Sequence, residues 1–160
     1  MGTVVLYVAV IVAANLLVAW LGPWFAPVIA LLLIGLDLSL RDSLHERWRG
    51  KGLWPRLLGM IVAASVVSYA LNPSTGRIAL ASLIAFTVAA LADTAVYQLL
   101  IRRGWYVKAN GSNIAGALAD SLLFPTIAFG GFMPAVVGLQ FVAKVAGGAG
   151  WAWVIRKTRG

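Results

Sequence analysis

The stretch TVVLYVAVIVAANLLVAWL, residues 3–21, decides the fold class because it is long, apolar and free of charge. An α-helix needs about 20 consecutive apolar residues to cross the hydrocarbon core of a bilayer. No basic segment precedes this stretch, and it is longer than the apolar core of a signal peptide. The residues therefore predict a membrane-spanning helix over 3–21.

Five further apolar stretches follow along the chain. They cover residues 24–40, 55–71, 77–101, 112–129 and 133–155. Turn signals such as Gly22-Pro23, Asn72-Pro73 and Gly130-Gly131 separate several of them, and the polar segment 41–52 is expected to be a hairpin. We predict an all-α polytopic membrane protein, a compact bundle of six transmembrane helices that forms a single domain over residues 1–160.

The composition excludes other classes. Hydrophobic residues make up 61% of the chain and charged residues only 11%, with a mean hydropathy of +0.91. About half of the residues of a soluble domain are apolar and about a quarter are charged. This chain has too few charged residues to form the polar surface that a soluble domain needs. The high apolar content excludes intrinsic disorder for the same reason.

The net charge of +8 is a topology signal. Eleven basic residues fall in the loops after the second, fourth and sixth predicted helices, and only Arg77 falls on the other side. The eleven are Arg41, Arg47, Arg49, Lys51, Arg56, Arg102, Arg103, Lys108, Arg156, Lys157 and Arg159. The positive-inside rule then places both termini in the cytoplasm, in a multi-pass protein of the cell (inner) membrane. Binding of nucleic acid is not expected.

Three of the five acidic residues lie inside predicted spans, at Asp37, Asp93 and Asp120. Each costs about 2.5–3.5 kcal/mol at mid-membrane, so these side chains are expected to face the interior. Lys144 in the last helix adds a similar cost. Binding of a small polar solute is one interpretation. A structural pairing of Asp93 with Lys144, or a capping role for Asp37, is the alternative.

Other polar and aromatic residues accompany these acids in the predicted spans. Amide and hydroxyl groups both donate and accept hydrogen bonds, and an aromatic ring can stack on a flat heterocycle. Hydrogen bonding between helices is the alternative for each polar residue, and helix capping is a further one for Ser112. The candidates for binding are Asn15, Ser112, Asn113, Phe86 and Phe124, and Gln98, Gln140 and Phe129 accompany them in the predicted spans.

Enzymatic motifs are weak or absent from the sequence. The chain has no cysteine and a single histidine, His45, which lies in the polar hairpin without a second metal ligand. There is no phosphate-binding glycine loop. We therefore expect no enzyme, no metal site and no cofactor.

Three segments resemble the VUT family of queuosine precursor transporters. They are VIALLLIGLDLSLRDSLHERWRGKG at 28–52, RIALASLIAFTVAALADTAVYQLL at 77–100 and WYVKANGSNIAGALADSLLFPTIAFGG at 105–131. The likeness extends weakly to Asn15 and Lys144, so that it covers most of residues 10–155. The third segment carries several polar positions in the family's order.

The resemblance implies a six-helix bundle like the substrate-binding components of energy-coupling-factor transporters. It also implies uptake of a 7-deazaguanine base such as 7-cyano-7-deazaguanine. Ala90 and Ala117 depart from the family's pattern, because the family commonly has Gln and Asn at these positions. The motif residues that carry over are Asp37, Asp93, Asp120, Lys108, Asn110, Ser112 and Lys144.

Two other functions are compatible with the residues. The chain could be a binding component whose energising partner, or a second copy, docks on a small-residue face formed by Ala9 and Ala13. Ordinary packing inside the bundle is the favoured explanation of that face. The chain could also be an accessory membrane protein that binds no substrate, and an intramembrane enzyme is a distant further alternative.

Overall fold

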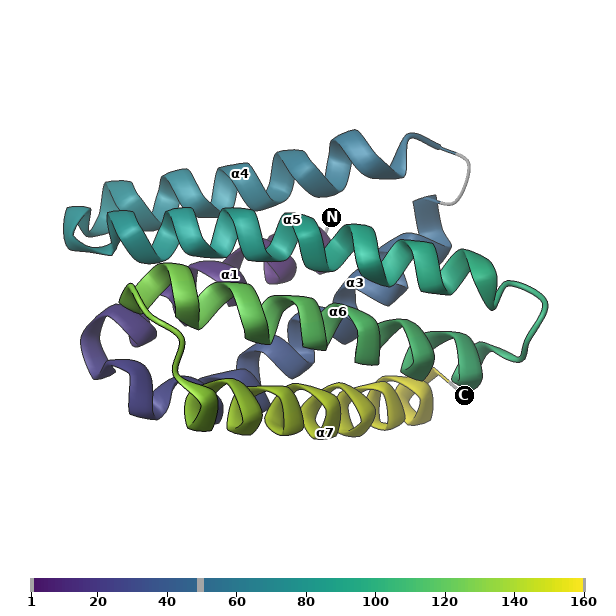
Figure 1. The fold of residues 1–160 in the computed structure, drawn as a ribbon. Coiled ribbons are helices and arrows are strands. Elements are labelled where there is room, and N and C mark those ends of the chain that lie inside the picture. The colour runs from purple at the N-terminus through teal and green to yellow at the C-terminus, as the bar shows by residue number, and fades with distance from the viewer. Residues whose placement is uncertain (1, 49–50, 160) are drawn as a thin grey trace.

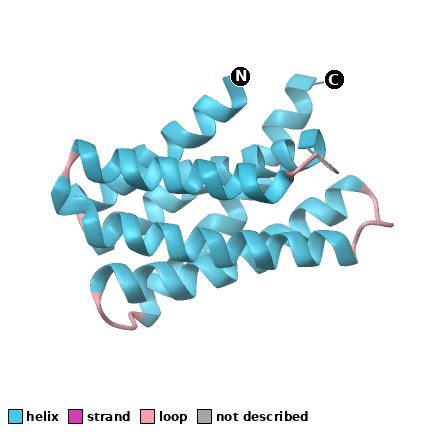
Figure 2. Cartoon of the chain, turned by 90° about the horizontal axis from the view of Figure 1, so that it is seen from above, coloured by secondary structure: helices cyan, strands magenta, loops and turns pink. Residues whose placement is uncertain are grey.

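The computed structural model describes residues 2–48 and 51–159, which form six helical rods joined by short turns (Figures 1 and 2). The first rod is α1 (Gly2–Leu21). The second joins a 3₁₀ turn (Pro23–Phe25), α2 (Ala26–Ile29), a π-helical segment (Ala30–Ile34) and α3 (Gly35–Trp48). The remaining rods are α4 (Leu53–Leu71), α5 (Gly76–Leu99), α6 (Trp105–Phe129) and α7 (Pro134–Arg159), with a 3₁₀ turn (Pro73–Thr75) before α5.

Neighbouring rods run in opposite directions, as short connections require. In Figure 1, α4, α5, α6 and α7 lie side by side, and α1 and α3 complete the bundle behind them. The most extensive contact is between α5 and α6. The described part of the chain is therefore all-helical, as the sequence predicts.

Five of the rods are long and apolar enough to cross a membrane. They are Gly2–Leu21, Pro23–Arg41, Leu53–Leu71, Pro73–Leu99 and Trp105–Phe129. Among the described residues α7 does not meet this criterion, although it packs along α3 and α6. Its sequence includes Gln140, Lys144 and a basic end, which lower its hydropathy. A sixth span thus stays a prediction.

Two predicted loops are wrong in part. The hairpin expected over 41–52 is helical as far as Trp48, because its Leu and Arg residues favour a helix and so continue the rod. The helix expected from 112 begins at Trp105 instead. Gly111, which suggests a turn in the sequence, lies inside this helix. A Cβ atom there would be 2.6 Å from Cδ1 of Leu100, so the glycine permits a close approach.

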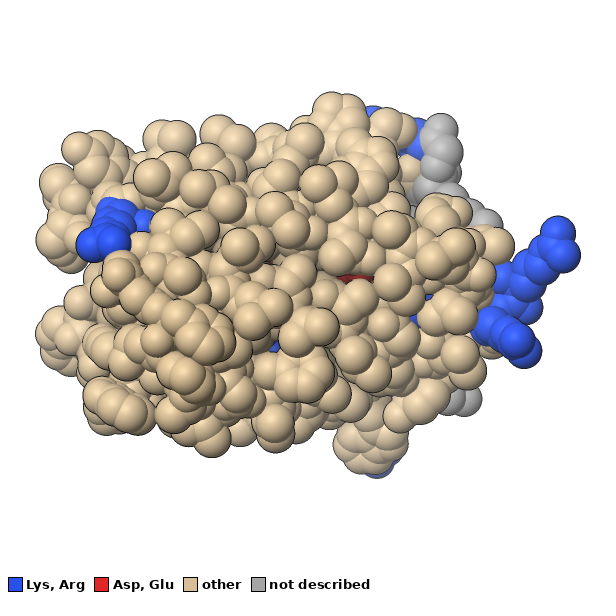
Figure 3. Space-filling model, in the orientation of Figure 1, with Lys and Arg blue, Asp and Glu red and all other residues tan. Residues whose placement is uncertain are grey.

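Apolar side chains occupy both the core and the outside of the bundle. Figure 3 shows a surface that is almost wholly neutral, with basic residues gathered at its two ends. The larger group lies at the end that carries the C-terminus, and acidic residues are hardly visible. At that end Arg56 lies over the ring of Trp48, and Lys157 over that of Trp153. Such a surface suits a bilayer with polar layers on either side.

The closest helix contact joins the second rod to α7. A Cβ atom at Gly147 would lie 2.2 Å from the carbonyl oxygen of Leu31 in the π-helical segment, and one at Gly35 only 2.6 Å from the backbone of Gly147. The indole N–H of Trp151 donates to the carbonyl of Leu32 at 3.0 Å. Small residues are what let two backbones approach this closely in membrane bundles.

Candidate binding site in the bundle core

Three helices bring the intramembrane acids inside the bundle, as expected from the cost of exposing them to lipid. Asp37 on α3, Asp93 on α5 and Asp120 on α6 are 1%, 1% and 4% exposed. Each lies on the buried face of its helix. The acids fall into two groups, one on either side of the middle of the core.

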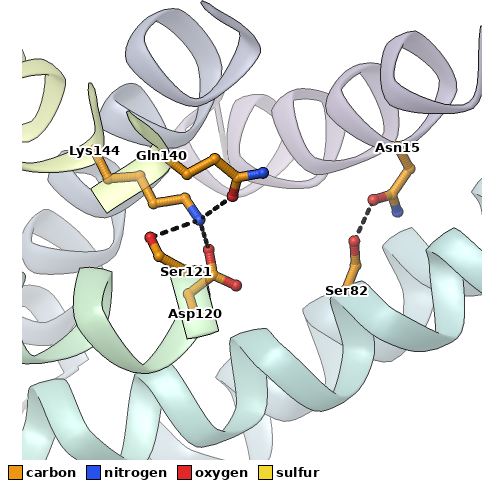
Figure 4. A network of polar contacts seen from close by, with 6 residues as sticks. All are labelled: Asn15, Ser82, Asp120, Ser121, Gln140 and Lys144. Atoms are coloured by element: carbon orange, nitrogen blue, oxygen red, sulfur yellow. Dashed lines mark hydrogen bonds and ion pairs between the residues drawn. The ribbon is translucent and has the colours of Figure 1, made fainter. Parts of the chain in front are cut away.

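The first group is an ion pair between α6 and α7 (Figure 4). The ammonium of Lys144 lies 2.6 Å from Oδ2 of Asp120. It also donates to Oε1 of Gln140 at 2.9 Å and to Oγ of Ser121 at 3.3 Å. We call Asp120, Lys144, Gln140 and Ser121 the lysine cluster. The structure thus pairs Lys144 with Asp120 and not with Asp93.

A chain of hydrogen bonds centred on Asn15 of α1 lies beside the lysine cluster. The amide of Asn15 donates to Oγ of Ser68 on α4 at 3.0 Å. The hydroxyl of Ser82 on α5 donates to Oδ1 of Asn15 (Figure 4). Both donor and acceptor atoms of this buried amide are therefore satisfied, and three helices are tied together.

A cavity of about 20 Å³ opens between the lysine cluster and Asn15. This volume holds about one water molecule. Five predicted site residues contribute to its wall, namely Asn15, Phe86, Asp120, Phe124 and Lys144. Ser82 and Gln140 are polar lining residues too, and the rest of the wall is apolar. A larger ligand needs the helices around this cavity to move apart.

The second group lies nearer the end with the C-terminus, and we call Asp37, Arg41 and Asp93 the arginine cluster. Arg41 follows Asp37 by one helical turn and exerts the strongest charge interaction on it. A Cβ atom at Gly116 of α6 would lie 3.3 Å from Cβ of Asp93 and 3.4 Å from Nη2 of Arg41. Gly116 thus leaves room for both side chains.

The buried position of Arg41 corrects the sequence analysis, which counted it among the loop charges. Arg41 is only 2% exposed, because α3 continues past it and turns it toward the core. Lys108 is also buried, over the ring of Tyr97 at 4.9 Å, since α6 begins before it. Of the other nine basic residues, Arg49 lies outside the described residues, and the remaining eight belong to segments at the predicted cytoplasmic end.

Three predicted residues near the start of α6 lie away from the cavity. The amide of Asn110 donates to the carbonyl of Tyr106 at 2.8 Å within its own helix. The hydroxyl of Ser112 donates to the carbonyl of Ala109, and Ser112 is not a helix N-cap because α6 begins at Trp105. Asn113 is buried and faces Gly148 of α7.

Sequence reasoning missed several polar residues of the core. Arg41 could have been found from its spacing of four residues after Asp37, which places both on one helix face. Ser82 and Ser121 carry no such signal, because a single serine in a membrane helix is common. Among the described residues no group of three or more His, Cys, Asp and Glu side chains could hold a metal ion.

The model of the "Putative vitamin uptake transporter" family matches residues 2–155. The chain belongs to this family. The comparison with curated proteins and the comparison with solved structures gave no match. Family membership and five apolar spans together make the chain a multi-pass membrane protein of an uptake transporter family.

Proposed function

We propose that this protein takes up a queuosine precursor, 7-cyano-7-deazaguanine or a related 7-deazaguanine base, across the cell (inner) membrane. The observation that carries the proposal is the lysine cluster, whose Asp120 and Lys144 line a cavity together with two phenylalanines. The resemblance to queuosine precursor transporters supports the choice of base. Intramembrane Asp residues bind the substrate in this proposal.

The ion pair offers complementary groups to one edge of a guanine-like base. That edge carries a ring N–H and an amino group, both donors, next to a carbonyl acceptor. Oδ1 of Asp120 has no hydrogen-bond partner among the described residues, so it can accept from the donors. The ammonium of Lys144 can donate to the carbonyl. An adenine-like edge would leave these buried groups unpaired and would be rejected.

The aromatic side chains supply a second contact. Phe86 on α5 and Phe124 on α6 both line the cavity. Stacking of a base on an aromatic ring is worth about 1–3 kcal/mol. Stacking on these rings, together with the hydrogen bonds to the edge of the base, favours binding of a flat heterocycle over binding of an aliphatic solute. Asp37, Asp93, Asn110, Ser112 and Asn113 stay predicted binding residues that lie outside this wall.

The cavity of about 20 Å³ is too small for a deazaguanine. Binding therefore needs a more open arrangement of the helices, as expected of a transporter that exposes its site to each side in turn. The proposal includes six spans, both termini in the cytoplasm, and a bundle like that of energy-coupling-factor binding components.

A thermal-shift measurement on the purified protein tests the substrate. We expect 7-cyano-7-deazaguanine to raise the melting temperature and 7-deazaadenine, of similar size, to leave it unchanged. Asp120→Asn should abolish the shift, since the amide cannot accept two N–H groups at one edge. Equal shifts with both bases would contradict the edge recognition, and no shift with any deazaguanine would contradict the substrate.

A binding component that needs an energising partner is the second candidate. Ala9 is exposed and, with Ala13, lines an outer groove between α1 and α4. This small-residue face is thus not filled by packing inside the bundle, and a partner helix would fit there. Proteoliposomes that contain only this protein separate the candidates. Uptake of the base in them would argue against the partner.

A further inference from the structure

Two buried polar atoms in the wall of the cavity have no hydrogen-bond partner in the described part of the chain. They are Oδ1 of Asp120 and Nε2 of Gln140. Gln140 of α7 is 1% exposed, and a buried amide N–H without a partner is costly in an apolar interior. Such atoms are rare in native proteins. Two of them at one cavity indicate a place where a polar molecule binds.

The orientation of the Gln140 amide follows from its contact with Lys144. Gln140 precedes Lys144 by four residues on α7, so both side chains lie on one face of the helix. The ammonium of Lys144 can only donate, and it lies 2.9 Å from Oε1 of Gln140. The NH₂ group of the amide therefore points away from the ammonium. In Figure 4 this nitrogen and the second oxygen of Asp120 both lie on the side of the lysine cluster that faces Asn15 and Ser82.

The other polar groups of the wall already have hydrogen-bond partners. The ammonium of Lys144 has three hydrogens, and a carboxylate, an amide oxygen and a hydroxyl of the lysine cluster accept them. It can donate to a bound molecule only if it gives up one of these acceptors. On the opposite wall, the hydroxyl of Ser82 donates to the amide of Asn15. The wall thus has one acceptor atom and one donor group without a partner among the described residues.

We propose that these two groups bind a cyclic lactam, in which Oδ1 of Asp120 accepts from the ring N–H and the Gln140 amide donates to the adjacent carbonyl. A lactam has a donor next to an acceptor along one edge, which complements the acceptor and the donor of the wall. The inference rests on the proposed function, because a 7-deazaguanine base has a lactam edge. It adds Gln140 as the residue that selects the carbonyl group of the substrate.

Binding of 7-cyano-7-deazaguanine and of its 6-thio analogue to the purified protein tests the donor. The analogue keeps the ring N–H but has sulfur, a weak acceptor, in place of the carbonyl oxygen. We expect wild type to bind the oxo base about tenfold more tightly than the thio base. Gln140→Met should bind both bases with equal dissociation constants. Equal binding of the two bases by wild type, or an undiminished preference in Gln140→Met, would overturn the inference.

Ser121→Ala is the matched control, because Ser121 also accepts from Lys144 but does not line the cavity. If Gln140 only holds Lys144 in place, the two variants should behave alike. We expect Ser121→Ala to keep the preference for the oxo base, and a preference lost equally in both variants would contradict the proposal. If Gln140→Met does not fold, Gln140→Glu decides. It keeps an oxygen for Lys144, has a second oxygen in place of the NH₂ group, and should lose the preference.

Saturation-transfer NMR with 2-pyridone, a single lactam ring, separates this inference from the proposed function. We expect transfer to 2-pyridone in wild type, and none in Gln140→Met or to N-methyl-2-pyridone, which lacks the N–H. If wild type gives this pattern but binds no deazaguanine, the proposed substrate is wrong and the lactam site stands. If wild type binds 7-cyano-7-deazaguanine without preferring it to the thio base, the substrate stands and the lactam site is wrong. Binding of neither compound overturns both proposals.

Discussion

Lys144 is held in the bundle core by three partners from two helices. Asp120 neutralises its charge, and Gln140 and Ser121 accept its other two hydrogens. A buried charge that loses its partner is far more costly than a pair that is absent altogether. The pair is therefore expected to behave as a unit, both in stability and in binding.

A double-mutant cycle tests this unit. Lys144→Gln or Asp120→Asn alone should each destabilise the protein by about 3–5 kcal/mol, because each leaves a buried charge unpaired. The double variant should recover much of the loss, since two neutral amides can bond to each other. Unfolding of the purified protein in detergent measures all four proteins. Additive losses in the double variant would contradict the expectation.

Asn15 is a second residue that joins helices, here by neutral hydrogen bonds. Ser82→Ala removes one of them and should cost about 0.6 kcal/mol, and Asn15→Leu removes two and should cost about twice as much. Thr126→Val is the control, because its hydroxyl bonds only to Leu122 of its own helix. Unfolding of the purified protein in detergent again measures the stability of each variant. A loss of stability in Thr126→Val as large as that in Asn15→Leu would refute the role of the network.

At the scale of the element, the contact between the π-helical segment and α7 stands out. A π-helical turn widens the rod at Ala30–Ile34, and the backbone of α7 lies against it at Gly147. Ser39 of α3 donates to the carbonyl of Gly148 next to this contact, at 3.2 Å. Segments of this kind are frequent at functional sites. Here the segment borders the cavity through Ala30 and Ile34.

Gly147→Ala should push α7 away from the second rod, because the new methyl group would lie 2.2 Å from the carbonyl oxygen of Leu31. Overpacking of this kind costs about 1–3 kcal/mol. Gly150→Ala in the same helix meets nothing within 4 Å and is the matched control. Its stability should be unchanged or slightly higher, since alanine favours a helix. Equal melting temperatures for the two variants would show that the contact is not close in solution.

At the scale of the whole molecule, most basic residues gather at the end with the C-terminus (Figure 3). Arg77 lies at the start of α5 and donates to the carbonyl of Ile127 near the end of α6. This asymmetry is the basis for expecting both termini in the cytoplasm. The asymmetry remains although Arg41 and Lys108 point inward, because the other loop charges in the described part of the chain lie in segments at the expected end.

Labelling of introduced cysteines tests the orientation, since the chain has no native cysteine. Ser74→Cys lies in the exposed turn before α5, and Arg102→Cys lies in the exposed turn after it. A membrane-impermeant maleimide should label Ser74→Cys in intact cells and should label Arg102→Cys only after permeabilisation. The reverse pattern would invert the topology.

The positions of the helices were largely predictable. An uncharged stretch of membrane length has one stable backbone state in lipid, the helix, so that 3–21 corresponds to α1 within one residue. The errors in the predicted helix ends lie at 41–48 and 105–111. These residues are polar, so the hydropathy is low there, but the helical hydrogen bonding continues through them. Those two extensions are what carry Arg41 and Lys108 into the core.

The sequence by itself determined the class of the protein, its apolar spans, its family and the need to bury three acids. The family follows from the order of motif residues along the chain, and the others follow from local composition or from the cost of a charge in hydrocarbon. Only the tertiary structure decided that Lys144 pairs with Asp120, that Arg41 is buried in the core, and that Gly147 meets Leu31. Partners on different helices depend on how each rod is rotated and where it ends, and those are set by side-chain packing between segments far apart in the chain.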